Sequence, residues 1–224
     1  MISIIVPVLN EENKIEKTLQ VLDRLKGQKE IIVVDGGSCD NTVKIAKSYG
    51  IVTESSKGRA RQMNKGAEES SGDILWFVHS DSIVSVDSLG KIKETIDKGY
   101  IGGGFQLYFY DMDTLFMRYI AKTSNMRAKY LQLIFGDQGI FVKKDIFEKM
   151  NGYKDIELME DWDFSRRLHK MGKVKMVESK IGTSARRFSS GGQLKTFLLM
   201  QKIRLLYLLG KSPSELNKMY REVR

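Results

Sequence analysis

Polar side chains follow three of the apolar runs in the first half of the sequence, at the point where each run ends. The three clusters contain Asn10 and Glu11, then Asp35 with the residues GGSCDNT, then His79, Ser80 and Asp81. Carboxylates at such positions accept hydrogen bonds from a nucleotide base or its ribose. A carboxylate beside an imidazole could also hold Mg²⁺ or Mn²⁺ together with substrate phosphates. The clusters therefore indicate a nucleotide and cation site, although each could also be an ordinary turn.

A fourth acidic group opens a predicted helix in the second half, at Glu160, Asp161 and Asp163. Acids in a first helical turn are favoured by the helix dipole, which is a sufficient structural reason for them. One of them could instead be a general base that removes the proton of an attacking hydroxyl. The segment GDQG at residues 136–139 could be a plain turn, or it could position the acceptor; the sequence does not decide between these two roles.

Two pairs of arginines lie in glycine-containing segments, Arg59 with Arg61 and Arg186 with Arg187. The guanidinium fork binds phosphate groups well, whereas ordinary surface charge is the alternative for any single arginine. The patterns GxxxxGK[ST] and GxGxxG are absent, so a P-loop NTPase and a dinucleotide-binding enzyme are not supported.

The elements that precede these clusters decide whether the clusters meet, because the carboxyl ends of parallel strands share one sheet edge. Short β-branched apolar runs predict buried strands, and the segments between them predict helices. The predicted strands are 3–9, 30–34, 51–54 and 73–78, and the predicted helices are 11–25 capped by Asn10, 42–48 and one within 57–70. This alternation predicts an α/β protein with a parallel, doubly wound sheet.

The second half is less regular, and no linker rich in Pro, Gly or Ser divides the chain. Its predicted strands are 102–110, 136–142 and 174–177, and its predicted helices are 88–98, 115–133, 145–150, 161–170, 193–209 and one from Pro213 with Ser212 as its cap. We expect one domain over residues 1–190 and a helical tail over residues 191–224.

Composition narrows the classes of protein and partner. The 224 residues carry a net charge of +9 and a single cysteine, Cys39, so an intramolecular disulfide and a multi-cysteine metal site are excluded. No stretch reaches the about 18 apolar residues of a spanning helix and no signal peptide is evident, so we expect a cytoplasmic protein. Basic residues are not interleaved with stacking aromatics, so nucleic acid is not an expected partner. The C-terminal helix could contact the inner face of the membrane, the core or a second subunit.

Taken in order, the segments SIIVPVLNEE, IIVVDGGSCDNT, FVHSD and EDW resemble family-2 glycosyltransferases of the GT-A fold. GRARQMNKGA, GDQGIFV and ARRF are similar to a bacterial subgroup commonly named for arsenosugar biosynthesis. The resemblance implies a Rossmann-like GT-A fold whose mostly parallel central sheet is flanked by helices, with a helical C-terminal tail. It implies an inverting enzyme that transfers a sugar from a nucleotide-diphosphate sugar, usually UDP-linked, to the hydroxyl of an unknown acceptor.

The resemblance also implies residue roles. It assigns the nucleotide to Pro7, Asn10, Glu11, Asp35, Arg59, Asn64 and Ser80. It assigns the diphosphate to Arg186 and Arg187, and the acceptor to Gly136, Asp137 and Gln138. Asp161 would be the catalytic base, paired with Glu160, and Asp81 would hold Mn²⁺ or Mg²⁺. His79 stands where the family's DXD motif has its first acid, so a single carboxylate would supply most of the metal binding.

Three other functions remain open on the sequence. One is a non-catalytic nucleotide-binding protein that kept the fold, to which the His79 departure gives weight. Another is a metal-dependent nucleotidyltransferase, although NEENK is acidic where such an enzyme needs a glycine-rich basic loop after the first strand. The last is a basic nucleic-acid-binding module.

Overall fold

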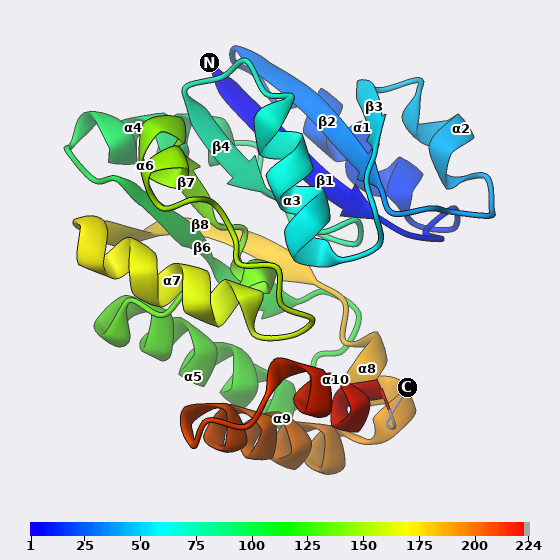
Figure 1. The fold of residues 1–224 in the computed structure, drawn as a ribbon, viewed down its shortest axis with the longest axis vertical. Helices are drawn as coiled ribbons and strands as arrows, with labels where there is room; N and C mark the ends of the chain where they lie inside the picture. The colour runs from blue at the N-terminus through cyan, green and yellow to red at the C-terminus, as the bar shows by residue number, and fades with distance from the viewer. Residues whose placement is uncertain (222–224) are drawn as a thin grey trace.

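An eight-stranded sheet forms the centre of the computed structural model, which describes residues 1–221. The strands are β1 (Ile2–Val8), β2 (Lys29–Asp35), β3 (Ile51–Glu54), β4 (Ile74–Phe77), β5 (Ile83–Val84), β6 (Gly102–Phe109), β7 (Phe141–Lys143) and β8 (Val174–Thr183). They lie in the order β3-β2-β1-β4-β7-β6-β8-β5 (Figure 1). Strands β3, β2, β1 and β4 are parallel, β6 and β8 are parallel, and β7 runs antiparallel between the two groups. The predicted α/β class with a mostly parallel sheet is therefore confirmed.

Helices cover both faces of the sheet (Figure 1). They are α1 (Ile15–Asp23), α2 (Thr42–Ala46), α3 (Arg59–Glu68), α4 (Ser88–Asp97), α5 (Leu115–Leu131), the short 3-10 helix η1 (Gly136–Gln138), α6 (Lys144–Lys149), α7 (Glu160–Met171), α8 (Arg186–Gly191), α9 (Gln193–Leu208) and α10 (Pro213–Arg221). Helices α1, α2 and α4 bury apolar side chains in the cluster on one face, and α3, α6 and α7 do so on the other.

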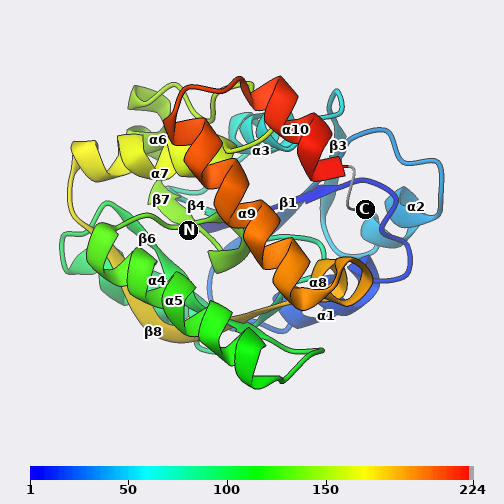
Figure 2. The ribbon, with the colours of Figure 1, turned by 90° about the horizontal axis from the view of Figure 1, so that it is seen from below.

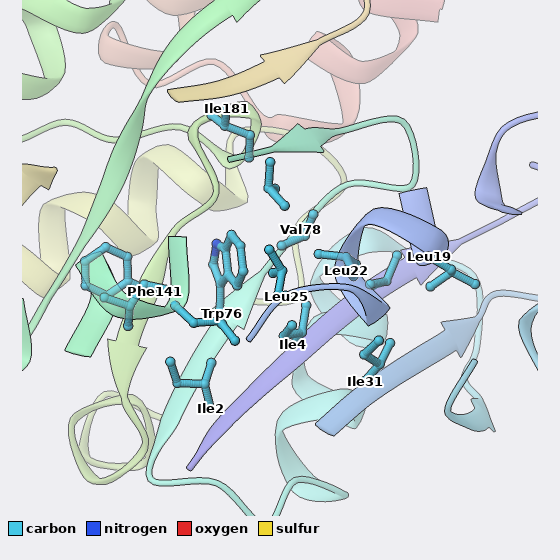
Figure 3. Close-up of a cluster of buried hydrophobic side chains, with 14 of the residues drawn as sticks. Ile2, Ile4, Leu19, Leu22, Leu25, Ile31, Trp76, Val78, Phe141 and Ile181 are labelled. Atoms are coloured by element: carbon cyan, nitrogen blue, oxygen red, sulfur yellow. The ribbon is translucent and has the colours of Figure 1, made fainter. Parts of the chain in front are cut away.

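The central strand β1 shows why the apolar runs form buried strands. Successive side chains of a strand point to opposite faces. Ile4 and Val6 accordingly join the α1 face of the core, while Ile5 joins the α3 face. Figure 3 shows the first of these clusters, with Trp76 of β4 at its centre. A strand that is apolar on both faces must lie inside a covered sheet, which fixes the order of layers.

Several element boundaries differ from those expected. Helix α1 begins at Ile15 instead of residue 11, because Asn10 has a φ of 53° and Oδ1 of its side chain accepts a hydrogen bond from the N–H of Cys39. The predicted strand 136–142 is instead η1 followed by β7, and β8 continues to Thr183. Helix α8 was not predicted, because SARRFSSGG has no apolar periodicity.

The C-terminal helices pack on the body of the protein beside α7, and Figure 2 shows α9 crossing this end of the molecule with α5 beside it. Their shared cluster contains Leu158, Met159 and Trp162 from the α7 end and Ile203 and Leu216 from α9 and α10. The last three residues of the predicted tail, 222–224, lie outside the described residues. Among residues 1–221, no helix is both long enough and apolar enough to cross a membrane.

Candidate active site

A cavity of about 710 Å³ opens at the edge where β1 and β4 end. It brings together most of the residues that the sequence singled out, from segments far apart in the chain. Those that line it are Pro7, Asn10, Glu11, Arg59, His79, Ser80, Asp81, Asp137, Glu160, Asp161, Arg186 and Arg187. The order of the strands explains why the residues that follow them lie close together, since β1 lies between β2 and β4 and all three run in the same direction.

Hydrogen bonds join the loops after β1 and β2 beside the cavity. The N–H of Asn10 donates to Oγ of Ser38 over 2.9 Å, and the N–H of Glu11 donates to Oγ1 of Thr42 over 2.8 Å. Asp35 is buried, and its carboxylate accepts hydrogen bonds from the N–H of Gly37 and from both the N–H and the hydroxyl of Ser38. Asp35 therefore stabilises the turn that carries Ser38 and does not line the cavity.

His79 is positioned as a neutral imidazole. Burial lowers its pKa to about 4, and the positive charge of Arg59 acts in the same direction. Its Nε2 atom is buried and, within the part of the chain that the structure describes, has no hydrogen-bond partner. A buried ring nitrogen without a hydrogen-bond partner is costly unless something else binds it.

The guanidinium of Arg186 lies between two acidic side chains. Its Nη2 is 3.1 Å from Oε1 of Glu11 and 3.7 Å from Oδ2 of Asp81. Both carboxylates are mostly buried, whereas about half of the arginine side chain is exposed. Because α8 begins at Arg186, this short helix carries a positive charge to the ends of β1 and β4.

A divalent cation would find only part of its ligand set in these side chains. The candidates are Nε2 of His79 and the carboxylate of Asp81. Residues 1–221 contain no group of three or more His, Cys, Asp or Glu side chains that could hold a metal. Mn²⁺ accepts imidazole and carboxylate ligands and completes its shell with phosphate and water oxygens. The donor set thus fits a cation that arrives with, or is completed by, a phosphorylated substrate.

Asp161 lies in the first turn of α7, where the loop residue Met159 adopts a φ of 69°. Its Oδ2 accepts a 2.9 Å hydrogen bond from the N–H of Gly136, and its Oδ1 accepts one from the N–H of Trp162. A Cβ atom on Gly136 would lie 2.9 Å from Nε2 of His79 and 3.6 Å from Oδ2 of Asp161. Gly136 therefore lies against His79 and Asp161, which both line the cavity, and a Cβ atom at this position would crowd the His79 ring.

Glu160, next to Asp161, is paired with Arg59. Nε of Arg59 lies 3.3 Å from Oε1 of Glu160, whose side chain is 3% exposed while that of Arg59 is 40% exposed. Burial raises the pKa of Glu160, and the positive charge of Arg59 opposes this rise. The arrangement holds the arginine at the cavity wall, so Glu160 positions Arg59.

Two of the expected ligand-binding amides are instead engaged by the protein. The Asn64 side chain donates to the carbonyl of Tyr153 and accepts from its N–H, at 2.8 and 2.9 Å. The Gln138 side chain is buried and accepts hydrogen bonds from Arg127 and the N–H of Phe135. Neither side chain lines the cavity, because both amides are bonded to the protein around it, and their expected contacts with the nucleotide and the acceptor stay predictions.

Phe135 and Arg204 are among the cavity residues that sequence reasoning did not assign to the site. Arg204 is one of the basic residues of the C-terminal helix, for which a contact with a membrane, the core or a second subunit was expected, and no role was expected of Phe135. The only available signal was the position of Phe135 directly before GDQG. Helix α9 is remote in sequence from the cavity, and its arginine reaches the site only through tertiary packing.

Comparison with known proteins places the chain among glycosyltransferases. The family described as Glycosyl transferase family 2 matches residues 3–150. The chain is 25% identical over 199 residues to "Probable glycosyltransferase YdaM" of Bacillus subtilis, which covers 76% of this chain and 47% of that protein. It is 26% identical over 182 residues to glycosyltransferase AglE of Haloferax volcanii, which covers 68% of this chain and 55% of that protein. The chain thus spans about half the length of these curated relatives.

Solved structures share the fold at low sequence identity. The mannosyltransferase PcManGT from Pyrobaculum calidifontis, in complex with GDP-Man and Mn²⁺, superposes with a TM-score of 0.69 at 15% identity, over 99% of this chain and 69% of that one. Glucosyl-3-phosphoglycerate synthase from Mycobacterium tuberculosis, in complex with Mn²⁺, UDP and glucosyl-3-phosphoglycerate, gives a TM-score of 0.58 at 20% identity, over 82% and 70% of the two chains.

Proposed function

The chain belongs to glycosyl transferase family 2, and on that premise we propose that it transfers a sugar from a nucleotide-diphosphate sugar to an acceptor hydroxyl with inversion at the anomeric carbon. The observation that carries the proposal is the convergence of Asp161, Arg59, Asp81 and Arg186 on one cavity. Such a transfer requires a carboxylate that accepts the proton of the acceptor and guanidinium groups that bind the diphosphate.

In the proposed reaction, Asp161 accepts the proton of the acceptor hydroxyl as its oxygen attacks the anomeric carbon. The bond from that carbon to the diphosphate oxygen breaks on the opposite face, and the nucleoside diphosphate leaves with the electron pair. The Gly136 N–H holds Oδ2 of Asp161, which orients the carboxylate toward the acceptor. Positioning and charge neutralisation supply most of the acceleration in such a site.

The leaving diphosphate would be neutralised from one side of the cavity. Arg59, Arg186 and Arg187 line it and provide positive charge. His79 and Asp81 would hold a divalent cation, Mn²⁺ or Mg²⁺, whose chemistry is to offset the charge on the departing phosphate oxygens. We propose a uridine nucleotide as the donor and a hexose as the transferred sugar.

Replacement of the proposed base tests the assignment. Asp161→Asn should bind the nucleotide as the native enzyme does and lose turnover by about 10²-fold or more, the usual scale for a lost general base. Turnover is measured as release of nucleoside diphosphate from UDP-sugars and GDP-sugars. Asp97→Asn, an exposed acid of the same kind on α4, is the matched control and should leave turnover unchanged. Near-native turnover of Asp161→Asn would reject Asp161 as the base.

We also propose that helices α5 and α9 contact the surface of an anionic membrane. Most of the exposed large apolar side chains of residues 1–221 lie on or next to these helices: Leu115, Tyr119, Met126, Tyr130, Leu131, Leu194, Leu198, Leu205, Leu208 and Leu209. Neither helix contains an acidic residue, whereas both carry Lys and Arg. Apolar side chains combined with positive charge only are typical of helices at a lipid interface.

A further inference from the structure

Two arginines converge on the ring of Phe135 beside the active-site cavity. Cζ of Arg127, from α5, lies 3.6 Å from the ring centroid, and Cζ of Arg204, from α9, lies 4.9 Å from it. The ring also packs against Trp162 of α7 at 5.5 Å between centroids. Stacking on an aromatic face holds a guanidinium in place without consuming its hydrogen-bond donors.

Neither of these two positive charges forms an ion pair in the part of the chain that the structure describes. Within residues 1–221, neither Arg127 nor Arg204 has a carboxylate within 4.0 Å. Arg127 donates to the carbonyl of Leu133 and to Gln138, and Arg204 donates to Gln201 over 3.3 Å. The donors at Nη1 of Arg127 and at Nε and Nη2 of Arg204 have no acceptor in this part of the chain.

The pKa shifts of Arg127 and Arg204 indicate that the protein stabilises their positive charges incompletely. Burial, and then the charge of Arg204, lower the pKa of Arg127 to about 10. Burial also lowers the pKa of Arg204, while Asp137 and Asp161 oppose the shift. Asp137 is a poor counter-charge for the pair, because burial raises its pKa and its Oδ1 has no hydrogen-bond partner among the described residues. Two cations held together in a partly dry site favour a bound anion.

A second cavity of about 220 Å³ lies where the two arginines meet, between α5 and α9. The rest of its wall is mixed: Ile120, Phe188, Phe197 and Met200 are apolar, whereas Tyr119, Thr123, Ser124 and Gln201 carry polar groups. Ile120, Ser124, Phe188, Met200 and Arg204 line this cavity and the active-site cavity alike. A molecule in the small cavity would therefore lie next to the space that contains Asp161.

We propose that this α5–α9 pocket binds the acceptor, and that the acceptor is an amphiphile whose phosphate or carboxylate group pairs with Arg127 and Arg204 while its apolar part lies against Ile120, Phe197 and Met200. The inference rests on the proposed function, because it takes the hydroxyl of that acceptor to be the one that Asp161 deprotonates. The bidentate guanidinium fork recognises planar or tetrahedral oxyanions, and the apolar side chains of the wall distinguish a chain-bearing anion from a free one.

The probe for this pocket is octyl phosphate below its micelle-forming concentration. Octyl glucoside is the control that lacks the charge, and inorganic phosphate is the control that lacks the chain. Calorimetry and the fluorescence of Trp162, which packs on Phe135, report binding. We expect saturable binding of octyl phosphate only. Arg127→Gln and Arg204→Gln should each weaken it by about 10-fold or more, the scale of a lost charged hydrogen bond. Lys129→Gln and Lys202→Gln, exposed lysines of the same two helices, should change it by less than about twofold.

Separate readings distinguish the ways in which this inference could fail. UDP and GDP binding with Mn²⁺ is measured on every sample: if neither nucleotide binds, the proposed function fails, whereas nucleotide binding without octyl phosphate binding overturns the pocket alone. Equal binding of inorganic phosphate would reject the amphiphile, and equal binding of octyl glucoside would reject the anion. Arg127 also holds the Leu133 carbonyl, so Arg204→Gln is the decisive variant if Arg127→Gln unfolds. An unchanged octyl phosphate affinity in folded Arg204→Gln would overturn the proposal.

Discussion

The N–H of Gly136 donates a 2.9 Å hydrogen bond to Oδ2 of Asp161, which ties the GDQG segment to the start of α7. The same glycine faces Nε2 of His79, which has no hydrogen-bond partner among residues 1–221. One backbone position thus borders both the proposed base and a proposed metal ligand. A displacement of that position would therefore disturb both proton removal by the proposed base and binding of the proposed cation.

Gly136→Ala should therefore reduce turnover strongly. The added Cβ would lie 2.9 Å from the buried His79 ring, so either the ring or the GDQG backbone must move. A misplacement on the order of 1 Å in a catalytic site costs roughly 10²-fold in rate. Turnover is compared with Gly90→Ala on α4, where a Cβ meets nothing within 4 Å. The control should keep full turnover, and equal turnover of the two variants would contradict the role given to Gly136.

Removal of Arg59 should destabilise the protein in a pH-dependent way. Arg59→Gln leaves the buried Glu160 carboxylate without its cation, a cost of roughly 1–3 kcal/mol in the free energy of unfolding. Burial already holds the pKa of Glu160 above its value in the unfolded chain, and loss of Arg59 raises it further. A carboxyl with a raised folded pKa costs stability above that pKa and ceases to do so when it is protonated. The deficit should therefore shrink as the pH falls.

Urea unfolding at about pH 7.5 and about pH 5.5 measures this deficit relative to the native enzyme. The control is the double variant Arg59→Gln with Glu160→Gln, measured relative to Glu160→Gln alone. Neither of these proteins has the Glu160 carboxylate, so the deficit between them should not depend on pH in this range. If Arg59→Gln lowers the free energy of unfolding equally at both pH values, Arg59 does not stabilise the ionised carboxylate of Glu160.

The first half of the fold could be predicted because local signals and tertiary structure agree there. The runs ending at Val8, Asp35 and Phe77 are apolar on both faces, which is the pattern of covered parallel strands. Parallel order then places the residues after each strand at one edge, where Asn10, Glu11, His79 and Asp81 line the cavity.

The rest of the site could not be predicted, because it depends on packing between distant segments. Asn64 has the type and position of a ligand-binding amide, yet it pairs with the backbone of Tyr153, 89 residues away. Arg204 carries no local signal, and its position follows from the packing of Ile203 of α9 with Trp162 of α7. The second half of the sheet is mixed, so strand order there could not be derived from β-α-β alternation.

Arg186→Gln should change how the site binds cations and diphosphates. The guanidinium lies 3.7 Å from Asp81, so its removal leaves that carboxylate free of a competing cation. Mn²⁺ alone should bind more tightly by a few-fold, on the order of one exposed ion pair. UDP in EDTA should bind more weakly, since one phosphate-binding fork is lost.

Calorimetric titration of Mn²⁺, and of UDP, GDP and CDP with Mn²⁺ or EDTA, measures these changes and identifies the preferred base. Arg118→Gln, an exposed arginine on α5 paired with Asp113, is the matched control. Asp81→Ala should abolish the metal-dependent part of nucleotide binding. Tight metal-dependent binding in Asp81→Ala would reject that residue as a ligand.

The α5–α9 face should bind vesicles that contain anionic lipid. On α9 the exposed Leu194, Leu198, Leu205 and Leu208 recur at helical spacing, so they share one side of the helix. Leu198→Gln with Leu205→Gln should abolish co-sedimentation of the full chain with phosphatidylglycerol vesicles. Ile51→Gln with Val86→Gln removes two exposed apolar side chains elsewhere and should leave it intact.

The charge on the two helices predicts how vesicle binding depends on salt and on lipid composition in the same assay. Because α5 and α9 carry only basic charges, binding should weaken with added salt and be lost on phosphatidylcholine vesicles. Absence of lipid-dependent pelleting would reject the membrane contact. If sedimentation velocity then shows a dimer that Leu198→Gln with Leu205→Gln dissociates, the apolar face joins two copies of the chain, because the same side chains cannot be buried in both interfaces at once.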